Sequence, residues 1–198
     1  MFKFFYNSFI FSFISILIFT ILFSFFQIPI RKDFSSYGID EKDIHISPQG
    51  FYWPLPGKSY ISSYFGKRVS PTTGASTYHA GVDIPAPDGT YFLAVTDGEV
   101  IYTGFKGGGG YTITFKNDIY TISYCHVNPN FIVSVGDFIN SGDVIGQVGP
   151  KNVYDVLNNP YKDSLGNPTN GATTGSHLHI SIKKDGIAVN PLDYISID

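Results

Sequence analysis

Two histidines separated by one residue stand near the end of the chain, in the segment "TTGSHLHI" at residues 173–180. Alternate side chains of a β-strand point to the same face, so His177 and His179 would share one face while Leu178 faces the core. Residues two apart in a strand are separated by roughly 6 to 7 Å at the backbone. Both imidazoles can therefore reach one metal ion, or a water bound to it, together with partners from elsewhere in the chain.

A second candidate pair stands in "YHAGVDIPAPDG", where His79 and Asp83 are four residues apart. This even spacing puts both side chains on one face if the segment is extended. Imidazole and carboxylate are good zinc ligands, and a catalytic zinc has three protein ligands and one position for water. His126 ends the run "YTISYCHV". Four histidines and Asp83 therefore exceed the need of one catalytic zinc by two, and the spacing leaves open which of them bind.

The elements that must position these residues are predicted to be β-strands. From residue 51 onward, short runs of aromatic and β-branched residues are interrupted every eight to twelve residues by Gly, Asp, Asn or Pro, a pattern typical of an all-β domain. No long helix is predicted, and we expect a compact antiparallel β-sandwich. The predicted strands cover residues 61–65, 91–95, 99–105, 111–116, 120–127, 143–149 and 177–184.

Two segments between the predicted strands stand out. The four glycines at residues 107–110 predict a tight turn, and they lack the Gly-Lys-Ser/Thr ending of a phosphate loop. Residues 150–171 form a long segment rich in Pro, Asn and Gly without periodicity. Loops longer than roughly 12 to 15 residues in compact domains are usually functional or disordered. We therefore expect this loop to be either functional or disordered.

The first 30 residues differ in composition from the rest of the chain. Ten of the 18 Phe residues fall within the first 26 positions, and no charged residue stands between Lys3 and Arg31. The run at residues 4–30 exceeds the roughly 20 apolar residues that cross a hydrocarbon core, and it lacks the small-residue cleavage site of a signal peptide. We predict an uncleaved transmembrane helix here, with a cleaved signal peptide as the alternative.

The expected domain organisation follows from this boundary. Residues 1–30 form the anchor, the polar residues 31–48 form a linker or stalk that carries His45 as a bystander, and residues 49–198 form one domain. The basic charges on the two sides of the anchor nearly balance, so the positive-inside rule does not decide its orientation. Beyond residue 30 the chain has 12 basic and 16 acidic residues without a dense basic cluster, which argues against nucleic-acid binding.

Cys125 is the only cysteine, so an intramolecular disulfide and an all-cysteine zinc site are excluded. A purely structural zinc fits poorly, because such sites are usually closed by four protein ligands rich in Cys. A thiolate could in principle replace one zinc ligand, but strand alternation turns Cys125 away from the face of His126. We expect Cys125 to fill a small buried apolar position.

Seven motifs, taken in their order along the chain, resemble the lysostaphin-type zinc metallopeptidases, the LytM-like peptidoglycan endopeptidases. The resemblance extends from about Phe51 to Tyr194, and several spaced motifs together are far more specific than any one of them. The motifs are "FGKR", "HAGVDIPAPDGT", "AVTDGEV", "SYCHV", "VGDFINSGDVIGQVG", "TTGSHLHISI" and "VNPLDY".

The resemblance implies a role for each candidate residue. His79 and Asp83 of the H-x-x-x-D motif and His179, the second histidine of "HLH", would hold one Zn²⁺ per domain. His126 and His177 would be the catalytic histidines, which move protons or stabilise the oxyanion while a zinc-activated water attacks a peptide carbonyl. The expected fold is an antiparallel β-sandwich or barrel-sandwich hybrid with an active-site groove, and the expected substrate is a peptidoglycan peptide.

The implied target would also set the topology of the chain. The catalytic domain would lie on the extracytoplasmic side of a bacterial cell membrane as part of a single-pass protein, or would be secreted if the leader is cleaved. The alternative function is a non-catalytic envelope scaffold or a regulator of other wall hydrolases. The presence of all five motif residues weighs against that alternative.

Two positions depart from the family pattern. Ser176 stands where the family commonly has Pro in its "TG-HLH" motif. The 150–171 segment is longer than the short turn that precedes this motif in compact members. Because the longer segment adjoins the predicted site, we expect it to wall the groove, select the substrate or fold over the zinc.

Overall fold

The computed structural model describes residues 33–72 and 74–196. Helical structure in this part of the chain is limited to four 3-10 segments of three residues: η1 (Ser35–Tyr37), η2 (Glu41–Asp43), η3 (Gly107–Gly109) and η4 (Pro191–Asp193). None of the described helices is long and apolar enough to cross a membrane. The predicted transmembrane run at residues 4–30 lies outside the described residues.

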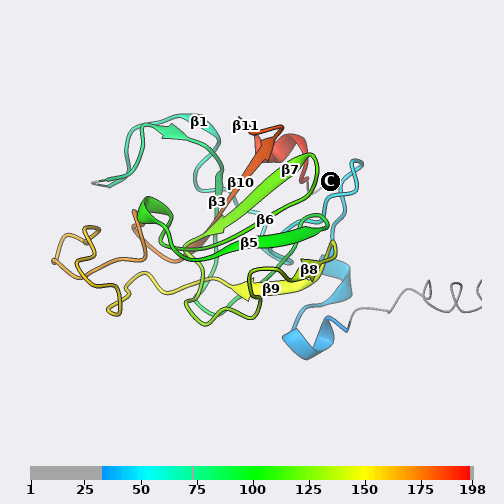
Figure 1. Ribbon diagram of the computed structural model, residues 1–198, viewed down its shortest axis with the longest axis horizontal. Coiled ribbons are helices and arrows are strands. Elements are labelled where there is room, and N and C mark those ends of the chain that lie inside the picture. The colour runs from blue at the N-terminus through cyan, green and yellow to red at the C-terminus, as the bar shows by residue number, and fades with distance from the viewer. Residues whose placement is uncertain (1–32, 73, 197–198) are drawn as a thin grey trace, which may run out of the picture. The chain divides into compact units, whose positions relative to one another are not determined.

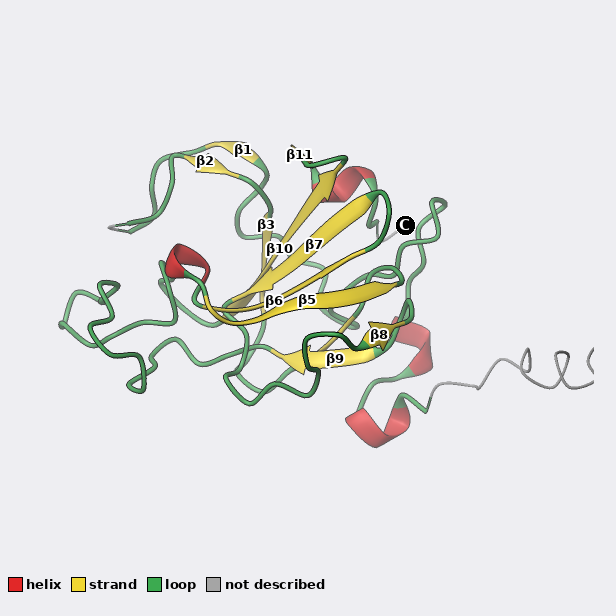
Figure 2. Ribbon diagram, viewed as in Figure 1, coloured by secondary structure: helices red, strands yellow, loops and turns green. Residues whose placement is uncertain are grey.

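Seven strands form the main sheet, in which every pairing between described strands is antiparallel (Figure 1, Figure 2). The order in space is β11-β10-β7-β6-β5-β8, and β3 also pairs with β10. The strands of this sheet are β3 (Val82–Pro85), β5 (Gly98–Phe105), β6 (Tyr111–Lys116), β7 (Tyr120–Cys125), β8 (Phe138–Ile139), β10 (His177–Lys184) and β11 (Ile187–Val189).

Two smaller sheets complete the domain, formed by β1 (Gly66–Lys67) with β2 (Tyr78–His79) and by β4 (Tyr91–Leu93) with β9 (Val144–Gln147). The β4–β9 pair packs on the main sheet. The ring of Phe92 stacks on the ring of Tyr124 with centroids 4.9 Å apart, and the Tyr124 hydroxyl donates to the Leu93 oxygen. The prediction of an all-β domain built from antiparallel sheets is confirmed, although the second layer has only two strands.

Strand β10 shows how the sheet carries both core and site. Leu178, Ile180 and Ile182 are fully buried, whereas His177 and His179 are half-buried on the opposite face. This alternation is the period of two that the sequence predicted. Burial of each large aliphatic side chain contributes about 1.5 to 3 kcal/mol, so the three core residues fix the register that presents the histidines.

The segment ahead of the first strand packs on the domain. Phe34–Asp198 form one compact unit. The rings of Tyr37 and Tyr91 lie 5.0 Å apart, and the backbone nitrogen of Trp53 donates to the oxygen of His45 over 2.8 Å. Part of the segment predicted as a stalk therefore contacts the domain.

The sequence located the long strands but not the short ones. Strands β6 and β10 have the bounds predicted at residues 111–116 and 177–184. The predicted strand at 61–65 is wrong, because only Ser63 forms an isolated bridge, with Asp83. The short strands β1, β2 and β8 were not predicted, because two residues are too few to show an alternating pattern.

The long loop at residues 150–171 is organised by one carboxylate. Asp163 accepts hydrogen bonds from the backbone nitrogens of Leu165 and Asn167, over 3.0 and 2.9 Å, and from Nζ of Lys151 over 3.1 Å. Partial desolvation would raise the pKa of Asp163, but these donors outweigh it and hold the pKa well below its usual range. The loop thus has a fixed internal structure without regular strands.

Candidate metal centre

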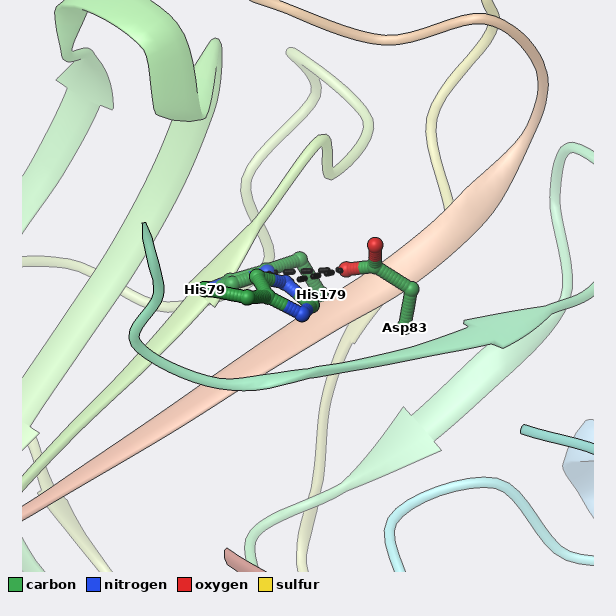
Figure 3. A group of neighbouring side chains, drawn as sticks. All are labelled: His79, Asp83 and His179. Atoms are coloured by element: carbon green, nitrogen blue, oxygen red, sulfur yellow. Dashed lines mark hydrogen bonds and ion pairs between the residues drawn. The ribbon is translucent and has the colours of Figure 1, made fainter. Parts of the chain in front are cut away.

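Three donor atoms from three strands meet at one place (Figure 3). His79 ends β2, Asp83 lies in β3 and His179 lies in β10. Nε2 of His79 lies 2.9 Å from Nδ1 of His179, and Oδ1 of Asp83 lies 2.8 Å from that Nδ1 and 3.1 Å from Nε2 of His79. The ladder places Asp83 opposite His179, which brings both side chains to one face. The residues implied as zinc ligands are thus brought together.

The chemistry of this donor set fits a zinc ion. Nδ1 of His79 lies 2.9 Å from the backbone oxygen of Tyr64, and because a carbonyl only accepts, this nitrogen is assigned the hydrogen. Nε2 of His79 then presents a lone pair to Oδ1 of Asp83 and Nδ1 of His179. Without a metal, these acceptors need a shared proton between them, and a divalent cation can replace that proton. Two imidazole nitrogens and one carboxylate oxygen are a zinc ligand set.

The environment keeps two of these groups in the protonation state that a metal requires. Burial alone would raise the pKa of Asp83, but the adjacent ring nitrogens of His177, His179 and His79 hold it well below its usual range. Burial lowers the pKa of His179, which favours the neutral ring. Metal binding needs an ionised carboxylate and neutral imidazoles, so both groups are ready to coordinate near neutral pH.

Two further histidines border the three donors. Nε2 of His177 lies 3.5 Å from Oδ1 of Asp83, and the rings of His177 and His126 have centroids 4.7 Å apart. Nδ1 of His177 faces the backbone oxygen of Gly175 over 2.9 Å. Nδ1 of His126 faces the backbone oxygen of Asn170 over 2.6 Å. Both Nδ1 atoms are therefore assigned the hydrogen, and each Nε2 is left as a proton acceptor.

His126 occupies this place because the chain leaves strand geometry there. Its φ angle is 59°, in the left-handed region that is uncommon for a residue other than glycine. The backbone of His126 is held on both sides, since its nitrogen donates to the oxygen of Gly109 and its oxygen accepts from the nitrogen of Gly149. Burial lowers the pKa of His126 to about 3, so the ring is neutral at physiological pH.

Asn170 is a supporting residue that the sequence did not reveal. Its side chain is fully buried; Oδ1 accepts from the nitrogen of Tyr111 over 2.7 Å, and Nδ2 donates to the oxygen of Val127 over 3.0 Å. The turn at Gly107–Gly110 packs directly on it, because a Cβ on Gly110 would overlap with the Asn170 oxygen. One asparagine in an aperiodic loop has no local pattern that could have identified it.

The prediction that Cys125 points away from the site is wrong. The ladder pairs Cys125 with His179, and opposite residues of a ladder share a face. Cys125 therefore lines the same groove as His126, because the turn in the backbone at His126 breaks the alternation that the sequence argument assumed. Burial raises the pKa of the Cys125 thiol to about 11, which keeps it protonated and a poor metal ligand.

The five residues lie in a groove of about 800 Å³. Its lining includes residues between β1 and β2, residues 108–109 and residues 172–177. The long loop reaches the turn between β1 and β2, since a Cβ on Gly74 would lie 2.8 Å from the ring of Tyr161. His45 is not among the residues that line the groove.

Comparison with known proteins decides the family. The model of peptidase family M23 matches residues 77–191, which is more than half of the chain and includes all five site residues. The chain belongs to peptidase family M23. The resemblance to lysostaphin-type peptidases that the motifs indicated is thereby confirmed.

Two of the similar proteins have names that describe different functions. The chain is 33% identical over 134 residues to the DD-carboxypeptidase/endopeptidase Mpg of Neisseria meningitidis, which covers 67% of this chain and 26% of that protein. It is 30% identical over 146 residues to the murein hydrolase activator NlpD of Escherichia coli, which covers 72% of this chain and 30% of that protein. The match therefore spans about a quarter to a third of these relatives.

Solved structures show the same fold. A zinc-containing peptidase from Vibrio cholerae has a TM-score of 0.56 at 22% identity, over 78% of this chain and 46% of that one. The catalytic domain of lysostaphin from Staphylococcus simulans has a TM-score of 0.54 at 22% identity, over 69% of this chain and 91% of that one. The chain thus has the fold of these two peptidases.

Proposed function

We propose that this M23 chain is a zinc metalloendopeptidase that hydrolyses peptide bonds in peptidoglycan. The observation that carries the proposal is the convergence of His79, Asp83 and His179 in one groove beside His126 and His177. The M23 family and the peptidoglycan-related name of the Neisseria relative support the substrate class.

The three donors would hold one zinc ion, and His126 and His177 would accept and donate protons. A zinc ion held by these residues would supply Lewis-acid chemistry, in which a water is activated and a carbonyl is polarised. His126 and His177 each have Nδ1–H directed to a backbone oxygen, so each can accept a proton at Nε2 without changing its ring orientation. A ring that has taken up a proton can donate to the oxyanion or the leaving amine.

A second candidate function is activation of other wall hydrolases without catalysis. The observation that favours it is the 30% identity to the protein named murein hydrolase activator. The two functions differ in what the histidines must do, because an activator needs neither a metal nor a proton acceptor in its groove.

Peptide release from peptidoglycan tests the choice between them. The purified full-length chain should contain close to one zinc and should release peptides from peptidoglycan until a chelator is added. His126→Ala and His177→Ala should keep zinc and lose most of the release, because neither residue belongs to the proposed ligand set. Full release by either variant would contradict the assigned mechanism, and no release by the wild-type chain would favour the activator.

The proposed target also suggests where the domain lies. We propose that the apolar run at residues 4–30 is a membrane anchor and that the M23 domain is extracytoplasmic, as its substrate requires. The alternative is a secreted domain released by cleavage of that run. Mass spectrometry of the mature protein distinguishes the two. The mass of the full sequence in the membrane fraction supports an anchor, and a mass that lacks residues 4–30 supports cleavage.

A further inference from the structure

The two oxygens of the Asp83 carboxylate have different partners. Oδ1 lies 2.8 Å from His179 and 3.1 Å from His79, as described above. Oδ2 accepts from Nη1 of Arg68 over 3.3 Å. The guanidinium group of Arg68 thus holds Oδ2 of the carboxylate, and Oδ1 faces the histidines.

The same nitrogen of Arg68 also reaches a second ligand. Nη1 donates to Oγ of Ser63 over 2.6 Å, and that oxygen lies 3.1 Å from Nδ1 of His79. Ser63 is itself fixed on β3, because its backbone oxygen accepts from the nitrogen of Asp83 over 2.9 Å. One guanidinium group therefore contacts Asp83 directly and His79 through Ser63.

The fold holds Arg68 in this position. Its backbone nitrogen donates to the oxygen of Thr77 over 2.8 Å, and Nε lies 3.4 Å from the oxygen of Ser76. The side chain is 21% exposed, which is low for an arginine beside an open groove. Among the described residues that line the groove, Arg68 is the only Lys or Arg, and Asp83 is the only acidic residue. The pair is therefore not part of a general charged surface.

We propose that Arg68 is a positioning residue of the metal centre. It contacts Oδ2 of Asp83, which would leave Oδ1 available to a metal, and it orients His79 through Ser63. The inference rests on the proposed zinc site and adds a residue that controls its geometry. Partners behind the ligands commonly contribute 10- to 100-fold to metal affinity.

Zinc affinity of the full-length chain tests this role. Arg68→Met removes the donors and keeps much of the aliphatic stem, and we expect it to raise the Kd for zinc about 10- to 100-fold in competition with a chelator. Ser63→Ala should raise the Kd by less, because it removes only the link to His79. The matched control is Lys67→Met, which removes a neighbouring exposed cation that is not among the residues lining the groove.

A second measurement reports the carboxylate itself. With Co²⁺ in place of zinc, a site that uses one carboxylate oxygen should give the intense visible bands of four-coordination. Arg68→Met frees Oδ2, which raises the coordination number and should weaken those bands, whereas Lys67→Met should leave them unchanged. A role limited to folding would change the thermal stability of the apo chain without this spectral change.

The outcomes separate this inference from the proposed function. If the wild-type chain binds no zinc, the proposed metal site fails. If the wild-type chain binds zinc and Arg68→Met has the same Kd and the same Co²⁺ spectrum, only the role of Arg68 fails. An equal loss of zinc affinity in Lys67→Met would also overturn the role of Arg68, since the loss of one positive charge would then explain the weaker binding. Should Arg68→Met not fold, the zinc Kd of Ser63→Ala still tests the proposal, and an unchanged Kd in that variant would contradict it.

Discussion

Nδ1 of His126 lies 2.6 Å from the backbone oxygen of Asn170, so a residue of the long loop holds the ring of a proposed catalytic histidine. The loop therefore supports the site, although residues 150–171 are not among those that line the groove. Since the side chain of Asn170 is fixed by the backbone groups of Tyr111 and Val127, its substitution should displace the carbonyl that orients His126.

Asn170→Asp is expected to lower kcat/KM about 10- to 100-fold with the zinc content unchanged. The substitution keeps an acceptor for the nitrogen of Tyr111 but places an anionic oxygen against the oxygen of Val127. Peptide release and metal content measured on the same sample check this. Asn130→Asp, at an exposed position, is the matched control. Equal rates for both variants would show that His126 does not depend on Asn170.

The proposed ligands should behave differently from the proposed catalytic histidines. His79→Ala or His179→Ala removes one of three donors, so each should lose zinc as well as peptide release. Metal analysis after exhaustive dialysis against buffer measures this. Zinc retained at wild-type level in both variants would show that the ligand set is wrong.

Acid should destabilise the metal-free domain through His126. Burial lowers the folded-state pKa of His126 to about 3, below the ordinary value of about 6.5. A depressed folded-state pKa gives stability that is present above pH 6.5 and is lost as the pH falls toward 3. The free energy of unfolding in urea and chelator should fall by up to about 1.4 kcal/mol per pH unit from this group. His126→Asn should give a flatter curve, and parallel curves would contradict the assignment.

The Tyr124 hydroxyl should contribute measurably to the stability of the core. It accepts from the nitrogen of Val95 over 2.9 Å and donates to the oxygen of Leu93 over 3.0 Å, all within buried residues. Tyr124→Phe leaves both backbone groups without this partner and should cost about 1 to 3 kcal/mol in the free energy of unfolding. Tyr154→Phe, at a residue 73% exposed, should change it little.

Shortening the long loop should change substrate preference. The nitrogen of Val153 donates to the oxygen of Pro168 over 3.1 Å, so the ends of the loop are close enough for a short turn. Replacing residues 154–167 by Asn-Gly removes Tyr161, whose ring lies next to Gly74 of the groove lining, and keeps Asn170. We expect mass spectrometry of digested muropeptides to show altered product ratios. An unchanged product pattern with normal zinc content would contradict a role in selecting the substrate.

Local pattern predicted those parts of the site that a single strand determines. The alternation in β10 placed His177 and His179 on one face, since each neighbouring aliphatic residue has a core position to fill. The even spacing of His79 and Asp83 and the motif resemblance supplied the rest of the predicted donor set, whereas the pairing of Asp83 with His179 is seen only in the structure. The residue roles remain predictions, because the structure brings the side chains together without showing what they do.

Other features depend on contacts that sequence alone does not contain. The orientation of Cys125 required the left-handed backbone at His126, which breaks the alternation of its strand. Asn170 acts through its carbonyl on His126, and its position is set by two separate backbone segments, at Tyr111 and Val127. Arg68 follows a two-residue strand too short to recognise by its pattern.

Asp83 and His179 are 96 residues apart in the chain and stand opposite one another in only one alignment of β3 with β10. A slip of one residue would turn one of the two side chains to the apolar face. A chain that pairs these strands wrongly would then lack a complete donor set. If the proposed site binds zinc, metal uptake during refolding would report the fraction of correctly paired molecules, and zinc stoichiometry would measure the fidelity of folding.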